Sequence, residues 1–208
     1  PGITLPITDS VRLDAEVSLE HQDSHYDYVS FGSQADRTRE SWSFTPRVRW
    51  QHGLGSLASE SVFGVDYYSG KVDASYSSSP NQNAKQDSTG VYLQNVTTLG
   101  AGWSSLLGAR YQNMDQSASQ EAYPAWFQPA IDGSAKNSAS AWDVGANYAS
   151  DGWRTYAKAG STFRFANTDE LFGYDPFTGT PVFAGNLKPQ TGKLQEIGGS
   201  ATLGPVKA

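Results

Sequence analysis

Cysteine is missing from this chain of 208 residues, and methionine occurs once, at Met114. Without cysteine there is no disulfide framework, no thiolate metal site and no thiol nucleophile. No run of about 18 apolar residues occurs, which excludes a transmembrane helix. Charge is scarce, because Asp, Glu, Lys and Arg make up 17% of the residues, below the roughly 25% of ordinary soluble domains. The net charge of −6 and the scattered basic residues give no support to nucleic-acid binding.

Alternation of apolar and polar residues with a period of two is the main pattern that is present. In 11–19 every odd position is apolar and every even position is polar or charged. Such alternation is typical of a β-strand with one apolar face, and helical periodicity is absent. We therefore predict an all-β, antiparallel chain of about eight strands. Further runs of this kind lie at 41–51, 103–111, 141–149, 153–164 and 196–203.

Two further strand-like runs are irregular. The run 61–76 has Phe63 and Val65 in odd phase but Val72 and Ala74 in even phase. One extra residue in a strand would change the phase, so we predict a β-bulge near 69–70. In the run 91–99 the apolar side is interrupted by Asn95, and the pattern leaves open which side is buried.

The connections between these runs alternate between long and short. The long ones are 22–39, 77–88, 115–139 and 167–191, and the short ones are 52–58, 100–102 and 150–152. In an up-and-down antiparallel sheet, every second connection returns to the same side, so the two sides differ. Bacterial outer-membrane barrels have this asymmetry, with short turns toward the periplasm and long loops toward the outside.

The apolar faces of the runs carry no charged residue, and five of the six tryptophans lie at strand ends. Trp50, Trp103 and Trp153 lie beside short connections, whereas Trp42 and Trp142 lie beside long ones. Membrane interfaces favour tryptophan, because its ring is apolar and its N–H is polar. An Arg or Lys on the lipid face of a barrel would cost about 2–4 kcal/mol at the midplane. The pattern favours a membrane barrel over the alternative, a soluble β-sandwich.

Eight short sequence blocks follow one another in a fixed order. They are 45–50, 64–68, 92–95, 107–111, 156–164, 167–172, 186–191 and 196–198. This ordered set resembles the β-barrel half of TonB-dependent outer-membrane receptors, a fold of about 22 strands with a plug in its lumen. By this resemblance, 1–208 is a partial β-barrel domain of four hairpins, cut from a larger barrel, without the plug and the remaining strands. The alternative is a small barrel in which about eight strands close on themselves.

The resemblance also suggests where the functional residues lie. Lumen-facing charges, among them Arg110, would contact the plug or line the water-filled interior. Arg164 and Glu196 are the pair expected to form salt bridges with the plug, and the alternative is that all these charges are simply solvated in the lumen. Aromatic residues of the outer loops would capture a large, amphipathic solute, with packing of the loops against themselves as the alternative. These aromatic residues are Tyr123, Trp126, Phe127, Phe172, Tyr174, Phe177 and Phe183.

The resemblance implies an active transporter in the outer membrane of a Gram-negative bacterium. Its solute would be bulky and scarce, most often an iron–siderophore complex, and its partners would be outer-membrane lipid and the TonB energy-coupling protein, reached through the plug. We expect no resident cofactor, no metal site and no catalysis, because no base is paired with a nucleophile. His21 and His25, with Asp23 and Asp27 nearby, fit a solvated loop better than a metal site. The other functions left open are a small outer-membrane enzyme or adhesion protein and a soluble binding module.

Overall fold

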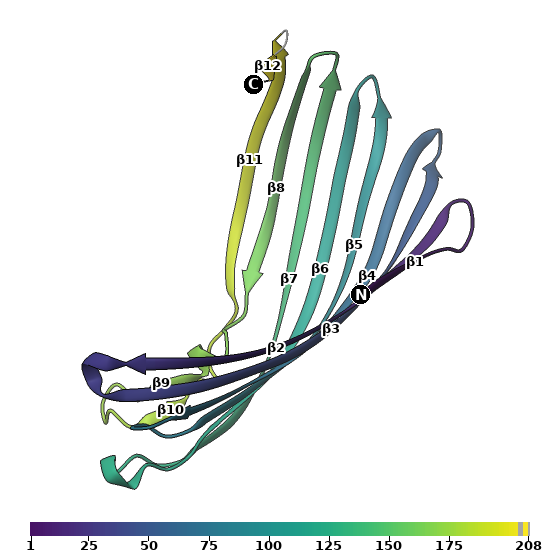
Figure 1. Ribbon diagram of the computed structural model, residues 1–208. Helices are drawn as coiled ribbons and strands as arrows, with labels where there is room; N and C mark the ends of the chain where they lie inside the picture. The colour runs from purple at the N-terminus through teal and green to yellow at the C-terminus, as the bar shows by residue number, and fades with distance from the viewer. Residues whose placement is uncertain (204–205, 208) are drawn as a thin grey trace.

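The computed structural model describes residues 1–203 and 206–207, without the side chains of 31, 126, 203, 206 and 207. Ten strands form one antiparallel sheet in the order β1-β2-β3-β4-β5-β6-β7-β8-β11-β12 (Figure 1). Within the described residues, no helix has the length and apolar character that a membrane crossing requires. The strands are β1 (Gly2–Pro6), β2 (Val11–Tyr28), β3 (Ser33–Leu54), β4 (Leu57–Tyr76), β5 (Gln82–Gly100), β6 (Trp103–Gln120), β7 (Ile131–Ser150), β8 (Trp153–Arg164), β11 (Gln190–Leu203) and β12 (Val206–Lys207).

The long connection between β8 and β11 has structure of its own. It contains the 3₁₀ turn η3 (Asp169–Leu171) and the two-stranded hairpin of β9 (Phe172–Tyr174) and β10 (Pro181–Phe183). Two other 3₁₀ turns, η1 (Val29–Phe31) and η2 (Pro124–Trp126), lie in the connections after β2 and β6. The sheet is one curved layer, and the β9–β10 hairpin lies along its lower part (Figure 1).

The sheet is open. In the described part of the chain, β1 and β12 are the two edges and do not pair with each other. The chain therefore does not form a small closed barrel, because closure requires the first and last strands to be hydrogen-bonded. The sheet contains the expected up-and-down strands, and the short strands β1 and β12 extend it at its two ends.

One row of residues across the strands, from Leu13 of β2 to Trp142 of β7, shows which side of the sheet is apolar. The side chains in this row lie on one face, which we call the outer face, and the residues one step along each strand lie on the inner face. On the inner face Asp14 pairs with Arg47, and Arg47 pairs with Gly64. The outer row is Leu13, Val48, Phe63, Leu93, Ala109 and Trp142.

The outer face has no protein layer over it among the described residues. Val48 is 37% exposed, Val144 42% and Trp142 52%. In a soluble β-sandwich such residues would be sealed against a second sheet. An apolar face of this size is instead what a strand wall presents to lipid. Asn95 lies on the outer face as well, opposite Ser61, which settles the side left open by the sequence.

The long connections proved much shorter than the sequence suggested. The prediction of loops at 22–39, 77–88 and 115–139 was wrong, because strands continue into all three and leave connections only at 29–32, 77–81 and 121–130. Spanning a bilayer takes about 9–11 residues per strand, whereas β2 has 18 and β3 has 22. Most residues of the extensions are polar, and their few buried apolar residues lie on the inner face. The apolar stripe of the outer face therefore ends although the backbone ladder persists.

The predicted bulge in β4 was also wrong. The register between β3 and β4 is the same on both sides of Ser69, which lies opposite Trp42. The apolar phase changes because the buried side of the sheet changes. Phe63 and Val65 lie on the outer face, whereas Val72 and Ala74 are buried on the inner face.

The buried apolar residues of the described strands lie on the inner face, and two of them, Ala84 and Ala118, pack with Leu171 of the connection between β8 and β11. Small side chains dominate the strand contribution to this core, and the connection supplies the larger side chains Phe165 and Leu171. The strand residues are Ala35, Val72, Ala74, Ala84, Met114, Ala118 and Ile131.

Candidate functional site

The connection 165–189 folds back onto the inner face and forms the centre of the candidate site. Leu171 is 1% exposed and packs with Ala84 of β5 and Ala118 of β6. Phe172 and Phe183 pack against this cluster. The ring of Phe183 occupies the space beside Gly133, where an added Cβ would come within 2.3 Å of it. Alanine and glycine on the strands thus leave the room that the connection fills.

Polar contacts hold the first turn of the connection in place. Arg37 of β3 donates from Nη2 to Asp169 Oδ1 at 2.6 Å. Arg164 binds Glu170 with two hydrogen bonds of 2.8 and 3.0 Å. Asn167 and Glu170 each accept a hydrogen bond from the other's backbone N–H, at 3.0 and 2.8 Å. The Arg164 hydrogen bond, followed by that from the Asn167 N–H, lowers the pKa of the Glu170 carboxyl.

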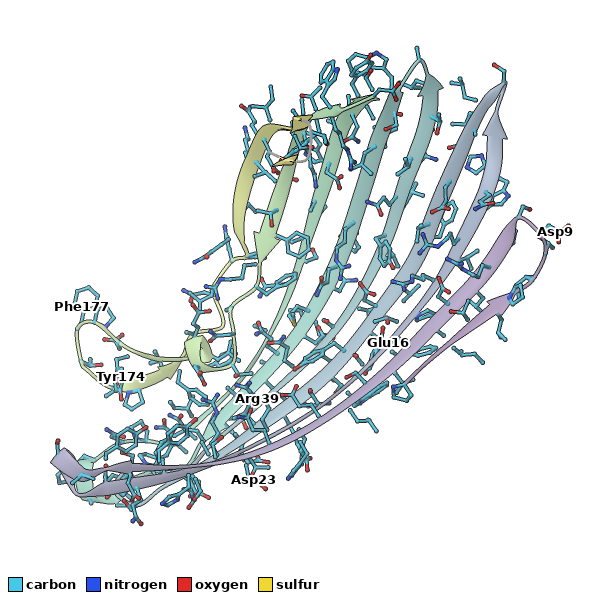
Figure 2. The ribbon with its side chains drawn as sticks, turned by 45° about the horizontal axis from the view of Figure 1, so that its top comes forward. Asp9, Glu16, Asp23, Arg39, Tyr174 and Phe177 are labelled. Carbon is cyan, nitrogen blue, oxygen red and sulfur yellow. The ribbon has the colours of Figure 1, made fainter. Side chains whose placement is uncertain are left out.

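The tip of the connection is ordered by Asp175. Its Oδ1 accepts hydrogen bonds from the backbone N–H groups of Phe177 and Thr178, at 2.9 and 2.8 Å. The Thr178 and Phe177 N–H groups lower the pKa of this carboxyl, because they stabilise its charged form. The turn presents two aromatic rings: Tyr174 is 68% exposed and Phe177 95% (Figure 2).

The seven aromatic residues predicted for the loops therefore occupy different environments. Phe172 and Phe183 take part in packing, and Tyr174 and Phe177 are exposed at the tip. On the connection between β6 and β7, Phe127 is 93% exposed. Tyr123 and Gln128 form an isolated β-bridge there, and the side chain of Trp126 lies outside the described residues.

The three predicted lumen residues lie on the inner face, each beside a partner in this chain. Arg110 binds Asp66 at 2.5 Å and donates to Gln112 Oε1 at 3.0 and 3.2 Å. Glu196 accepts a hydrogen bond from the Tyr156 hydroxyl at 2.5 Å. Arg164 pairs across the strands with Gln190, and Glu196 pairs with Lys158, so the structure does not bring Arg164 and Glu196 together.

A second inner-face cluster surrounds Asp14, near the short turns. Asp14 is buried and accepts a hydrogen bond from the Thr4 hydroxyl at 2.8 Å. The Nε atoms of Arg12, Arg47 and Arg49 lie 3.5, 3.5 and 3.9 Å from its carboxylate oxygens. Sequence analysis missed the central role of Asp14, because only strand register shows that all three arginines surround one carboxylate.

The histidines of the β2–β3 extension lie beside carboxylates. His25 lies 2.7 Å from Asp36 and 3.5 Å from Asp27, and His21 lies 3.1 Å from Asp23. Among the described residues no group of three or more His, Cys, Asp or Glu side chains has the arrangement of a metal site. Hydrogen bonding to Asp36 raises the pKa of His25, and that to Asp23 raises the pKa of His21.

The fold resembles that of a solved copper transporter and of two solved ferric receptors. The copper transporter OprC superposes with a TM-score of 0.79 at 14% identity, over 95% of this chain and 34% of OprC. The ferric-catecholate import receptor Fiu from E. coli K12 gives 0.75 at 12% identity, over 96% and 37% of the two chains. BauA, the ferric preacinetobactin receptor from Acinetobacter baumannii, gives 0.71 at 15% identity, over 97% and 34%.

This chain thus spans about a third of the length of those three proteins. No curated protein sequence matches it. A family model described as "TonB dependent receptor-like, beta-barrel" matches residues 3–203, which is nearly the whole chain. The chain therefore belongs to the TonB-dependent receptor β-barrel family, whose members lie in the outer membrane of Gram-negative bacteria.

Proposed function

We propose that this chain is the wall and part of the outer binding surface of an active transporter that takes up an iron–siderophore complex. Family membership and the ferric-receptor neighbours support this function. The observation that carries the proposal is the connection 165–189, which is docked on the inner face and holds Tyr174 and Phe177 exposed. Two exposed rings on an ordered turn suit the apolar part of a bulky chelate.

Uptake would begin with capture of the solute by these rings and by Phe127 on the neighbouring connection. The polar inner face would then offer a wall along which the solute moves, and no bond of the solute would be made or broken. The remaining strands of the barrel and a plug would complete the pore. Arg110, Arg164 and Glu196 would face that plug, and the TonB protein would supply the energy for its displacement.

Uptake assays with the full-length receptor test this function. The receptor would be produced in a strain that lacks its own siderophore receptors, with and without TonB. Radioiron would be supplied as ferric citrate, a ferric catecholate or a ferric hydroxamate. We expect uptake of at least one complex, and only in the strain with TonB. Equal uptake without TonB, or uptake of none of the three iron complexes, would contradict the proposal.

The role of the exposed rings has its own test. Replacing both Tyr174 and Phe177 by alanine should raise the half-saturating solute concentration about tenfold, because the solute loses its contact with both rings. A tenfold change corresponds to roughly 1.4 kcal/mol of binding free energy. The matched control is Val29→Ala, since Val29 is an 88% exposed apolar residue on the β2–β3 connection. Receptor amount on the cell surface is measured in parallel. Equal half-saturation in the two variants would remove these rings from the site.

A further inference from the structure

Five hydrogen-bonded polar side chains lie together on the outer face, at the end of its apolar region. Asn95 Nδ2 donates to Ser59 Oγ at 2.7 Å and to Ser61 Oγ at 3.0 Å. Thr97 Oγ1 donates to Asn95 Oδ1 at 2.9 Å, and His52 Nε2 lies 2.9 Å from Ser61 Oγ. We call this set, His52, Ser59, Ser61, Asn95 and Thr97, the outer polar cluster.

The register places the outer polar cluster near the short turns. Ser59 pairs with Thr97, and Ser61 pairs with Asn95. The two serines follow the β3–β4 turn on β4, and Asn95 and Thr97 precede the β5–β6 turn on β5. Trp50 stacks on His52 with ring centroids 4.2 Å apart. Tryptophan marks the boundary of the hydrocarbon, and short turns face the periplasm. The cluster therefore lies at the head-group level of the periplasmic leaflet.

A groove of about 570 Å³ begins at this cluster. His52, Ser61 and Asn95 line one end together with Leu54. The remainder is formed mainly by outer-face residues of β4 to β7, and the inner-face positions Gly108 and Asp143 also border it. In the middle of the groove, Ala109 lies between the larger residues Leu93 and Trp142 of the cross-strand row, and its small side chain leaves space there. The apolar part leads away from the short turns, toward Trp142 at the opposite boundary of the apolar band.

We propose that this groove binds one glycerophospholipid of the periplasmic leaflet, with an acyl chain along its apolar part and the glycerol–ester region at the outer polar cluster. The groove is polar at the head-group level and apolar toward the middle of the bilayer, which is the order of the polar and apolar parts of this lipid. The cluster contains no Lys, Arg, Asp or Glu, so it suits the uncharged ester and glycerol oxygens better than the phosphate. The volume is within the roughly 300–1,000 Å³ of small-molecule sites. The inference rests on the outer-membrane location and does not depend on the transported solute.

Native mass spectrometry of the purified full-length receptor tests the site. The receptor is stripped of lipid in detergent and titrated with palmitoyl-oleoyl phosphatidylethanolamine. Ala109→Trp would fill the groove, and Asn95→Leu would break the polar cluster. Ala15→Trp is the control, because Ala15 lies on the outer face of β2 and outside the groove. Heat-modifiable migration on a gel shows whether each variant is folded.

We expect the first lipid adduct to weaken at least fivefold in Ala109→Trp and Asn95→Leu and to stay unchanged in Ala15→Trp. Equal adducts in all four proteins would overturn the proposal, and so would a receptor dimer that Ala109→Trp dissociates, since a second copy would then be the occupant. A second measurement needs no variant. A phosphatidylethanolamine with a diazirine on its acyl chain should crosslink to peptides containing Leu107, Ala109 or Val144. Labelling spread evenly over the outer face would equally refute a specific site.

Discussion

The Arg37 guanidinium of β3 and the Asp169 carboxylate of η3 lie 2.6 Å apart, although 132 positions separate them in the sequence. Their contact joins the third strand to the connection after the eighth, across the inner face. Together with the packing of Leu171, it keeps the β9–β10 hairpin against the wall. The position of the exposed rings Tyr174 and Phe177 therefore depends on residues far from them in the chain.

Removing this ion pair should loosen the hairpin. Asp169 is 66% exposed at its side chain, so the pair contributes about 0.2–1 kcal/mol. We expect Asp169→Asn to raise the rate of proteolysis within 173–183 by up to about fivefold in the full-length receptor. Lys136→Ala is the control, because it removes an exposed pair with Asp115 on the outer face, away from the hairpin. Equal cleavage of the two variants would show that the Arg37 contact does not hold the hairpin.

Leu171→Ala should loosen the connection more than Asp169→Asn does. Leu171 is almost fully buried, and removing such a side chain costs about 2–5 kcal/mol. The loss should appear as faster hydrogen exchange in 169–183, while the membrane-spanning strands stay protected. Leu187→Ala is the matched control in the same connection, since Leu187 is 39% exposed. If both variants exchanged alike, the packing beneath η3 would not be what docks the connection.

The outer end of the β2–β3 hairpin should be less stable at alkaline pH. Asp36 and Asp23 raise the pKa values of His25 and His21 above the ordinary 6.5. A raised pKa in the folded state stabilises below the unfolded value and loses this effect as pH rises through the folded value. We expect hydrogen-exchange protection of 21–38, corrected for intrinsic rates, to be greatest below pH 6.5 and to fall above it. A double variant, His21→Asn with His25→Asn, should lose this dependence. Protection that increases with pH in the native hairpin would reverse the expected sign.

Charge on the outer face should be tolerated far less than charge on the inner face. Leu93→Arg places a cation in the apolar row and should cost about 2–4 kcal/mol of folding free energy in a bilayer. Gln94→Arg is its neighbour control, because Gln94 lies on the inner face between Val62 and Gly108. Folding of the full-length receptor into lipid vesicles, followed by urea titration, measures both. Equal costs would mean that the outer face does not contact lipid.

Much of the fold was predictable from the sequence, because alternation is a local property. The apolar positions Leu13, Val48 and Val144 and the tryptophans at strand ends identified the outer face and its two boundaries. Resemblance of the ordered sequence blocks identified the family. The strand extensions beyond the apolar band were missed, since most of their residues are polar and the apolar stripe of the outer face does not continue into them.

The remainder depended on tertiary structure. The sequence by itself determined that one side of the strands is apolar, since alternating side chains must point to opposite faces. Tertiary structure alone decided that Ala84 and Ala118 are buried on the inner side, because Leu171 of the returning connection packs on them there. It also decided that Phe172 and Phe183 pack while Tyr174 and Phe177 stay exposed. The sequence does not distinguish these four aromatic residues of one loop, because their burial depends on how the connection docks on the inner face.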